Sequence, residues 1–122
     1  MRETQKAWLA GIFDGEGCVW SRWPKNTNVV IEIKMTHLPT LKRINRLFPG
    51  RLVEGQLSGM SVKRQWRWTL DTNGSRKFLT MMMPYMVTKK NEAWVALKLC
   101  KRPITSRNVF DKLALMLKKC RE

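Results

Sequence analysis

Apolar side chains in the first third of the chain follow first a helical and then an alternating pattern. Residues 3–13 are densely apolar, which predicts a helix that is buried over most of its surface. Residues 18–23 and 29–36 predict two strands joined by a turn at 24–28, and the second strand alternates apolar with polar positions. This pattern is typical of a β-hairpin with one polar face.

The same order of a helix and two strands returns in the middle of the chain. Leucine and isoleucine recur every three residues over 38–47, which predicts a short amphipathic helix. Two more strands are expected at 51–57 and 62–71, and the second of them alternates basic or polar residues with apolar ones. Trp66 and Trp68 fall on the side away from the basic residues, so we expect them in a core under the helices.

Helical patterns fill the rest of the chain. Residues 71–75 supply capping side chains for a helix that runs to about Met83, and Pro84 interrupts it. Residues 87–102 and 106–120 predict two further helices. The predicted order is therefore α-ββ-α-ββ-α followed by trailing helices, an α+β fold in which helices cover one face of a four-stranded antiparallel sheet.

The composition of the chain indicates its size class and the kind of molecule that it binds. The 122 residues can build one modest core, so we expect a single domain spanning residues 1–122. The chain has 24 Lys and Arg against 9 Asp and Glu, a net charge of +15, which favours nucleic acid as the partner. No apolar run reaches the ~18 residues of a membrane span and no secretion signal is visible, so we expect a soluble, intracellular protein. Three widely spaced cysteines and one histidine make no zinc ligand set, and the thiols are expected to be reduced.

The polar face of the predicted sheet carries long side chains that suit DNA. A run of charge is usually only a solvated surface, but here basic residues alternate with apolar ones along strands. Four antiparallel strands have the dimensions of a ribbon that lies in the DNA major groove and presents polar side chains to base edges. We predict an interface with double-stranded DNA formed by Trp20, Arg22, Lys34, Lys63, Gln65 and Arg67.

Residues 9–17 read LAGIFDGEG and combine small residues with two carboxylates. Ala10 and Gly11 lie within an apolar helix and allow a second backbone to approach closely. Asp14 and Glu16 follow at the predicted helix end, where paired oxygen ligands would recruit Mg²⁺ if two such turns met across a two-fold axis. Two ions held in this way serve phosphodiester hydrolysis, because one activates water and the other stabilises the leaving oxygen.

This stretch resembles the LAGLIDADG motif of homing endonucleases, with five of nine positions identical and close replacements at the other four. The predicted α-ββ-α-ββ-α order is also that of the family. The resemblance implies that Glu16 is a metal ligand and catalytic residue, that the backbone carbonyl of Gly15 assists it, and that Asp14 supports the helix end. It implies Mg²⁺ as the cofactor, two or more ions per dimer, with Mn²⁺ or Ca²⁺ as substitutes in crystals. The family usually has Asp where this chain has Glu16, which leaves the level of activity open.

Further catalytic candidates also follow from the resemblance. Residues 86–93 are weakly similar to the family segment in which a basic residue at a helix start points into the active site. Lys89 fits that place best and Lys90 is the other candidate, while a solvated helix start remains the simpler interpretation of both. His37 closes the second predicted strand, where relatives carry a polar residue that positions the attacking water, and Lys42 is a weaker candidate on the next helix.

A single copy of the motif gives each chain half of an active site. A two-fold dimer through the helix 3–13 would bring two copies of Glu16 together. We expect this interface to contain Leu9, Ala10, Gly11, Phe13 and Asp14.

The sequence thus predicts a homodimeric, site-specific homing endonuclease that hydrolyses both strands of a pseudo-palindromic DNA. The alternative from a different class is a maturase-like or regulatory protein that uses the same fold to bind DNA or RNA without cutting it. A small basic RNA-binding protein would explain the charge but not the motif.

Overall fold

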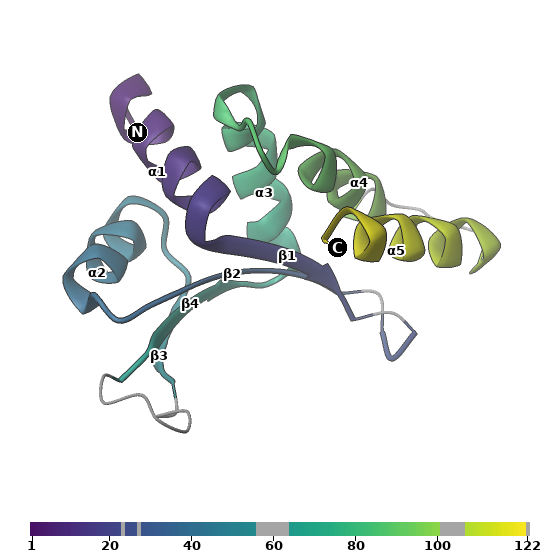
Figure 1. Cartoon of the computed structure of the whole chain (residues 1–122), viewed down its shortest axis with the longest axis horizontal. Coiled ribbons are helices and arrows are strands. Elements are labelled where there is room, and N and C mark those ends of the chain that lie inside the picture. Colours follow the sequence, from purple (N-terminus) through teal and green to yellow (C-terminus); the bar gives the residue numbers. More distant parts are fainter. Residues whose placement is uncertain (23, 27, 56–63, 101–106, 122) are drawn as a thin grey trace.

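Helix and hairpin follow one another twice in the structure, and further helices complete the chain (Figure 1). The computed structural model describes residues 1–22, 24–26, 28–55, 64–100 and 107–121. Its elements are α1 (Glu3–Glu16), β1 (Gly17–Ser21), β2 (Val29–Met35), α2 (Leu38–Leu47), β3 (Arg51–Glu54), β4 (Trp66–Leu70), α3 (Thr72–Met82), the 3-10 helix η1 (Met83–Tyr85), α4 (Lys90–Cys100) and α5 (Arg107–Arg121). This order confirms the predicted α+β fold.

The strands form one antiparallel sheet in the order β1-β2-β4-β3. Successive side chains point to opposite faces, as strand geometry requires. Ile31, Ile33 and Trp68 are fully buried on the side of the helices, whereas Arg67 is exposed on the other side. In Figure 1, α1, α3, α4 and α5 lie above the sheet and leave its lower face open. The hairpins therefore have one apolar and one polar face, as their alternation predicts.

Four aromatic rings form the centre of the core. The Phe78 ring, from α3, lies 5.3 Å from Phe13, 5.4 Å from Phe48 and 5.7 Å from Trp68, measured between centroids. Such tilted and edge-on pairs contribute about 0.5–1.5 kcal/mol each beyond the burial of area. Trp66 is half-buried and packs against the same core. The prediction that both strand tryptophans lie under the helices is confirmed.

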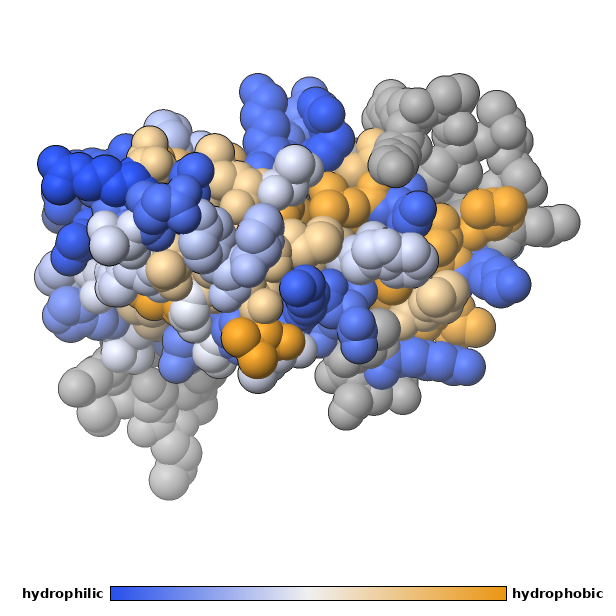
Figure 2. All heavy atoms as spheres, turned by 90° about the horizontal axis from the view of Figure 1, so that it is seen from above, coloured by the Kyte–Doolittle hydropathy of each residue, from blue (hydrophilic) through white to orange (hydrophobic). Residues whose placement is uncertain are grey.

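The outer surface of the helical layer is mixed in character. Figure 2, which views the molecule from above the helices of Figure 1, shows hydrophilic side chains gathered toward the α1 and α2 end and apolar patches toward the α5 end. The guanidinium of Arg43 on α2 lies 4.7 Å from the Trp8 ring centroid, which fastens α2 to α1. Within the described ranges, no helix is long and apolar enough to cross a membrane.

The element boundaries differ from the sequence prediction at several points: β1 ends at Ser21 and not at residue 23, α4 begins at Lys90 and not at residue 87, and the first helix and the second hairpin also differ. The first helix was predicted over residues 3–13, but α1 continues through Glu16, and the Gly17 N–H donates to the carbonyl of Phe13. Glycine lowers helix propensity by about 1 kcal/mol, and packing of the helix on the core outweighs this. The second hairpin is shorter than predicted, with β3 ending at Glu54 and β4 beginning at Trp66.

Gly17 joins α1 to β1 at a point with no room for a side chain. A Cβ there would lie 2.7 Å from Cε2 and 2.8 Å from the carbonyl oxygen of Phe13. Phe13 is fully buried and cannot move without disturbing the aromatic cluster. We expect Gly17→Ala to lower the free energy of unfolding by about 1–3 kcal/mol, as overpacked sites do, in urea denaturation. Lys77→Ala is the control, because it introduces an alanine at an exposed position of α3 away from α1; equal losses in both variants would contradict the steric argument.

Candidate functional site

The Glu16 carboxylate lies at the junction of α1 and the sheet. Glu16 is the last residue of α1, and the next residue, Gly17, pairs with Ile33 of β2. Glu16 is exposed, and its side chain has no hydrogen bond or ion pair with the described part of the chain. The last carbonyls of a helix carry partial negative charge. An exposed carboxylate beside them is a donor set that fits a hard divalent cation such as Mg²⁺.

The neighbouring carboxylate, Asp14, is fully engaged. Its Oδ2 accepts the N–H of Val87 at 2.8 Å, and its Oδ1 accepts the N–H of Lys89 at 3.1 Å. Its backbone carbonyl accepts the Thr88 hydroxyl at 3.1 Å and the Lys89 Nζ at 2.6 Å. Four hydrogen bonds thus tie the end of α1 to the segment before α4. Asp14 holds this junction together, which leaves Glu16 as the available carboxylate of the motif.

We expect Asp14→Ala to destabilise the protein by about 1–3 kcal/mol, because two backbone N–H groups lose their partners. Chemical denaturation followed by circular dichroism measures this loss. Lys90→Ala is the matched control on the same segment, since Lys90 is exposed, and it should unfold at the wild-type midpoint. A wild-type midpoint for Asp14→Ala would show that the two hydrogen bonds to the Asp14 carboxylate do not stabilise the junction.

The exposed face of α1 is lined by small residues. Ala7, Gly11 and Gly15 recur every four residues and are all exposed. Cβ atoms added at Gly11 or Gly15 would meet nothing within 4 Å. This stripe runs along the helix to the residue before Glu16, so a second helix packed against it would also reach the carboxylate.

The prediction for the dimer interface is corrected by this arrangement. Leu9, Ala10 and Phe13 are fully buried in the core of their own chain and cannot face a second copy. Gly11 is exposed, and Asp14 is half-buried at the junction with residues 87–89. Ala7 and Gly15, which the sequence prediction did not name, share the exposed face with Gly11, as their four-residue spacing around it indicates.

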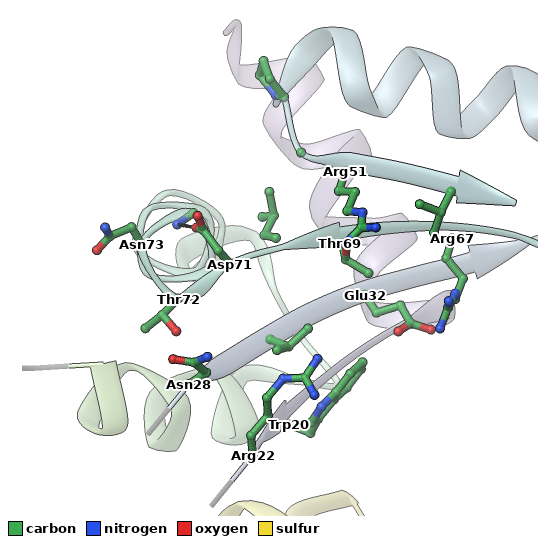
Figure 3. Close-up of a pocket in the computed structure, with 16 residues that line it drawn as sticks. Trp20, Arg22, Asn28, Glu32, Arg51, Arg67, Thr69, Asp71, Thr72 and Asn73 are labelled. Carbon is green, nitrogen blue, oxygen red and sulfur yellow. Dashed lines mark hydrogen bonds between the residues drawn. The ribbon is translucent and has the colours of Figure 1, made fainter. Parts of the chain in front are cut away.

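The open face of the sheet contains a hollow of about 1130 Å³, lined by strand residues, by loop residues and by the start of α3 (Figure 3). Trp20, Arg22 and Arg67, which the sequence analysis assigns to the polar face, line it. Lys34 lies on the same face, directly across from Arg67. Gln65 is half-buried just before β4, where its carbonyl accepts the N–H of Gly55 at 2.6 Å, and it does not line the hollow. Lys63 lies outside the described residues.

Sequence reasoning missed Arg51 on this face. Arg51 opens β3, is exposed and lines the hollow with Val53, two residues further along. The alternation of these two positions was the available signal. Together with Arg22 and Arg67 it gives the hollow three guanidinium groups from β3, β4 and the end of β1.

Solved structures with this arrangement were found by comparison of folds. The homing endonuclease I-CvuI, in complex with its DNA target and calcium, is 19% identical, with 97% of this chain and 80% of that chain covered at a TM-score of 0.71. The archaeal intron-encoded homing endonuclease I-Vdi141I, complexed with DNA, is 16% identical, with 98% and 86% covered at a TM-score of 0.76. The LAGLIDADG homing endonuclease I-SmaMI, bound to cleaved DNA, is 14% identical, with 94% and 42% covered at a TM-score of 0.67. This chain has the LAGLIDADG endonuclease fold. No family model matches the sequence, and no curated protein sequence matches it.

Within the LAGLIDADG fold, the other catalytic candidates lie in different surroundings. Lys89 is half-buried and its Nζ contacts the carbonyl of Asp14, two residues before Glu16. His37 is exposed, and its Nδ1 lies 2.6 Å from the Thr40 hydroxyl at the start of α2. The structure thus brings Lys89 to the motif, whereas His37 lies beyond the end of β2 with Thr40 as its partner. Lys42 is exposed on the next turn of α2.

The Cys100 thiol contributes no chemistry to this region of the LAGLIDADG fold. Cys100 is a buried free thiol at the end of α4. Burial raises its pKa to about 11, because the thiolate would lose its hydration. Cys100 is therefore protonated at neutral pH and is no nucleophile.

Proposed function

We propose that this chain is a homodimeric LAGLIDADG homing endonuclease that makes a site-specific double-strand break in DNA. The observation that carries the proposal is Glu16, an exposed carboxylate without a partner in the described structure, at the end of a helix whose outer face is built from small residues. The motif LAGIFDGEG, the fold and the DNA-bound state of the similar structures support the same conclusion.

The homodimer follows from the half-site in each chain. The described residues contain no cluster of three or more His, Cys, Asp or Glu that could hold a metal ion. Packing two α1 helices through Ala7, Gly11 and Gly15 would set two copies of Glu16 side by side. The coverage of only 42% of the I-SmaMI chain fits this arrangement, because one copy here corresponds to less than half of that protein.

Mg²⁺ would be held by the Glu16 carboxylate and the Gly15 carbonyl from each copy. When bound, such ions activate water and stabilise charge on the scissile phosphate. Lys89, fixed against the Asp14 carbonyl, adds positive charge beside this site. His37, oriented by Thr40, is the proposed polar group that positions water at the end of β2.

The open face of the sheet would bind in the DNA major groove. Its arginines and Lys34 offer both phosphate contacts and hydrogen bonds to base edges, and Trp20 offers an apolar surface for a thymine methyl group. Lys63 and Gln65 belong to the same proposed interface. A two-fold dimer presents two such faces, so the target should be pseudo-palindromic.

The decisive experiment exposes the protein to a randomised duplex DNA library with Mg²⁺ and sequences the cut ends. We expect double-strand cuts at one family of pseudo-palindromic sites. Enrichment of particular sequences by binding, without cuts in Mg²⁺ or Mn²⁺, would replace the endonuclease with the maturase-like or regulatory binder. Absence of both selective binding and cutting would reject the proposal altogether.

A further inference from the structure

Two carboxylates, those of Glu32 and Asp71, line the hollow on the open face, and Glu32 is the buried one. Glu32 of β2 is only 4% exposed and lines the hollow (Figure 3). Among the described residues of the strands it is the one acid on this face, because Glu54 alternates to the side of the helices with its cross-strand partner Trp66. A surface made only to hold phosphates gains nothing from a buried negative charge, so this side chain needs a different explanation.

Glu32 lies directly opposite Cys18 and Thr69, and the next pair along the same face consists of two cations. Lys34 and Arg67 are directly opposite in the register of β2 and β4, where like charges repel. Glu32 precedes Lys34 by two residues on the same face, and its Oε1 lies 3.5 Å from the Lys34 Nζ. Figure 3 shows the Glu32 and Arg67 side chains extending toward each other from adjacent strands. Glu32 forms an ion pair with Lys34 and none with Arg67 in the described structure, and its negative charge beside the two cations offsets their repulsion.

The buried Glu32 carboxylate also affects which DNA atoms Lys34 and Arg67 can contact. Its field repels phosphate groups, which carry full negative charge. The acceptor atoms of a guanine edge, O6 and N7, carry no net charge and are the usual partners of Arg and Lys in the major groove. The combination thus favours base edges over the backbone at the centre of the face.

We propose that Glu32 is a positioning residue for DNA sequence selection, which holds Lys34 and Arg67 together so that they read guanine edges instead of phosphates. This role rests on the DNA-binding part of the proposed function and is independent of cleavage.

The test compares Glu32→Gln with Glu54→Gln, which removes the same charge from the other side of the sheet. A randomised duplex library without divalent metal yields the preferred sequence of each protein. Dissociation constants for that sequence and for unrelated DNA are then measured across a salt series. We expect Glu32→Gln to reduce the ratio of specific to non-specific affinity at least tenfold. Its dissociation constant for unrelated DNA should fall. The logarithm of that constant should depend more steeply on the logarithm of the salt concentration, by about 0.9, the value for one further phosphate contact. Glu54→Gln should keep the wild-type ratio.

Two further variants can contradict the proposal even if Glu32→Gln folds poorly. Lys34→Gln changes a side chain that is 54% exposed, and it should relax the preference at the same guanine positions as Arg67→Gln. Adding Glu32→Gln to Arg67→Gln should remove little further selectivity, because the residue acts through its neighbours. Full selectivity in Lys34→Gln and Arg67→Gln would overturn the proposal.

The remaining outcomes separate this role from the proposed function. A wild-type selectivity ratio in Glu32→Gln, or an equal loss in Glu54→Gln, overturns the role of Glu32 while DNA recognition stands. A wild-type protein that selects no sequence overturns both. A wild-type protein that selects a sequence without cutting it rejects the endonuclease but supports the role of Glu32 if the ratio falls as expected.

Discussion

Replacing Glu16 with glutamine should abolish DNA cleavage and leave DNA binding unchanged. Glutamine has the same shape, and the exposed Glu16 side chain has no partner in the described structure that the fold would lose. The amide removes the negative charge that would hold the cation, a contribution of several kcal/mol to the transition state. Since each 1.36 kcal/mol is a factor of ten in rate, we expect single-turnover cleavage to fall by about 10³-fold or more.

The measurement uses the target found in the library experiment, with cleavage followed in Mg²⁺ and binding followed by gel shift in Ca²⁺. Glu54→Gln provides the control for charge, because its carboxylate pairs with Arg64 at the end of β3, and it should cut at the wild-type rate. Cleavage by Glu16→Gln within tenfold of wild type would place the metal elsewhere. Loss of binding together with cleavage would assign Glu16 a structural role.

The second large effect is expected from Gly11→Phe, which should convert a dimer into a folded, inactive monomer. Within one chain, nothing lies within 4 Å of the Cβ position of Gly11, so the ring does not disturb the core. Helices packed through small residues have backbones too close to accommodate an aromatic ring between them. Two copies of α1 would be forced apart, and the two Glu16 carboxylates would no longer meet.

Light scattering after size exclusion should show the monomer mass of 14.4 kDa for Gly11→Phe and twice that mass for wild type. Lys77→Phe, which adds the same ring to an exposed position of α3, should remain dimeric and active. A dimeric and active Gly11→Phe would move the interface away from α1. A wild-type protein that is a monomer at the concentrations used for cleavage would remove the shared site.

Elements with strong periodicity could be predicted from the sequence. The helix expected at 38–47 is α2, with the same boundaries, because its apolar spacing is regular and the following residues end it. The alternation of β4 correctly separates Trp68 in the core from Arg67 on the open face. The strand ends in the second hairpin could not be predicted, because side-chain alternation continues beyond the last paired residue.

The contacts of α1 could be predicted only in part. Its sequence is apolar around most of the helix, so local pattern does not say which residues enter the core of the same chain. Leu9, Ala10 and Phe13 are buried in the core of the chain. Ala7, Gly11 and Gly15 lie on the exposed side of the helix. Burial of this kind is decided by α3 and the sheet, which pack on the helix from distant parts of the chain.

The role of Asp14 at the helix end was predicted from the resemblance, but its partners were not. The hydrogen bonds to residues 87–89 span 73 to 75 positions in sequence. No periodic pattern reports a contact between segments so far apart. Arg51 was missed for a simpler reason, because its strand is short and its alternation covers only two positions on the open face.

The bond between Asp14 and the segment before α4 sets an order of events during synthesis. The motif leaves the ribosome early, but the groups that fix the end of α1 come from Val87, Thr88 and Lys89. A nascent chain that ends before these residues holds Glu16 on an unanchored helix end. Only a chain that has been synthesised beyond Lys89 can therefore fix the end of α1 beside Glu16.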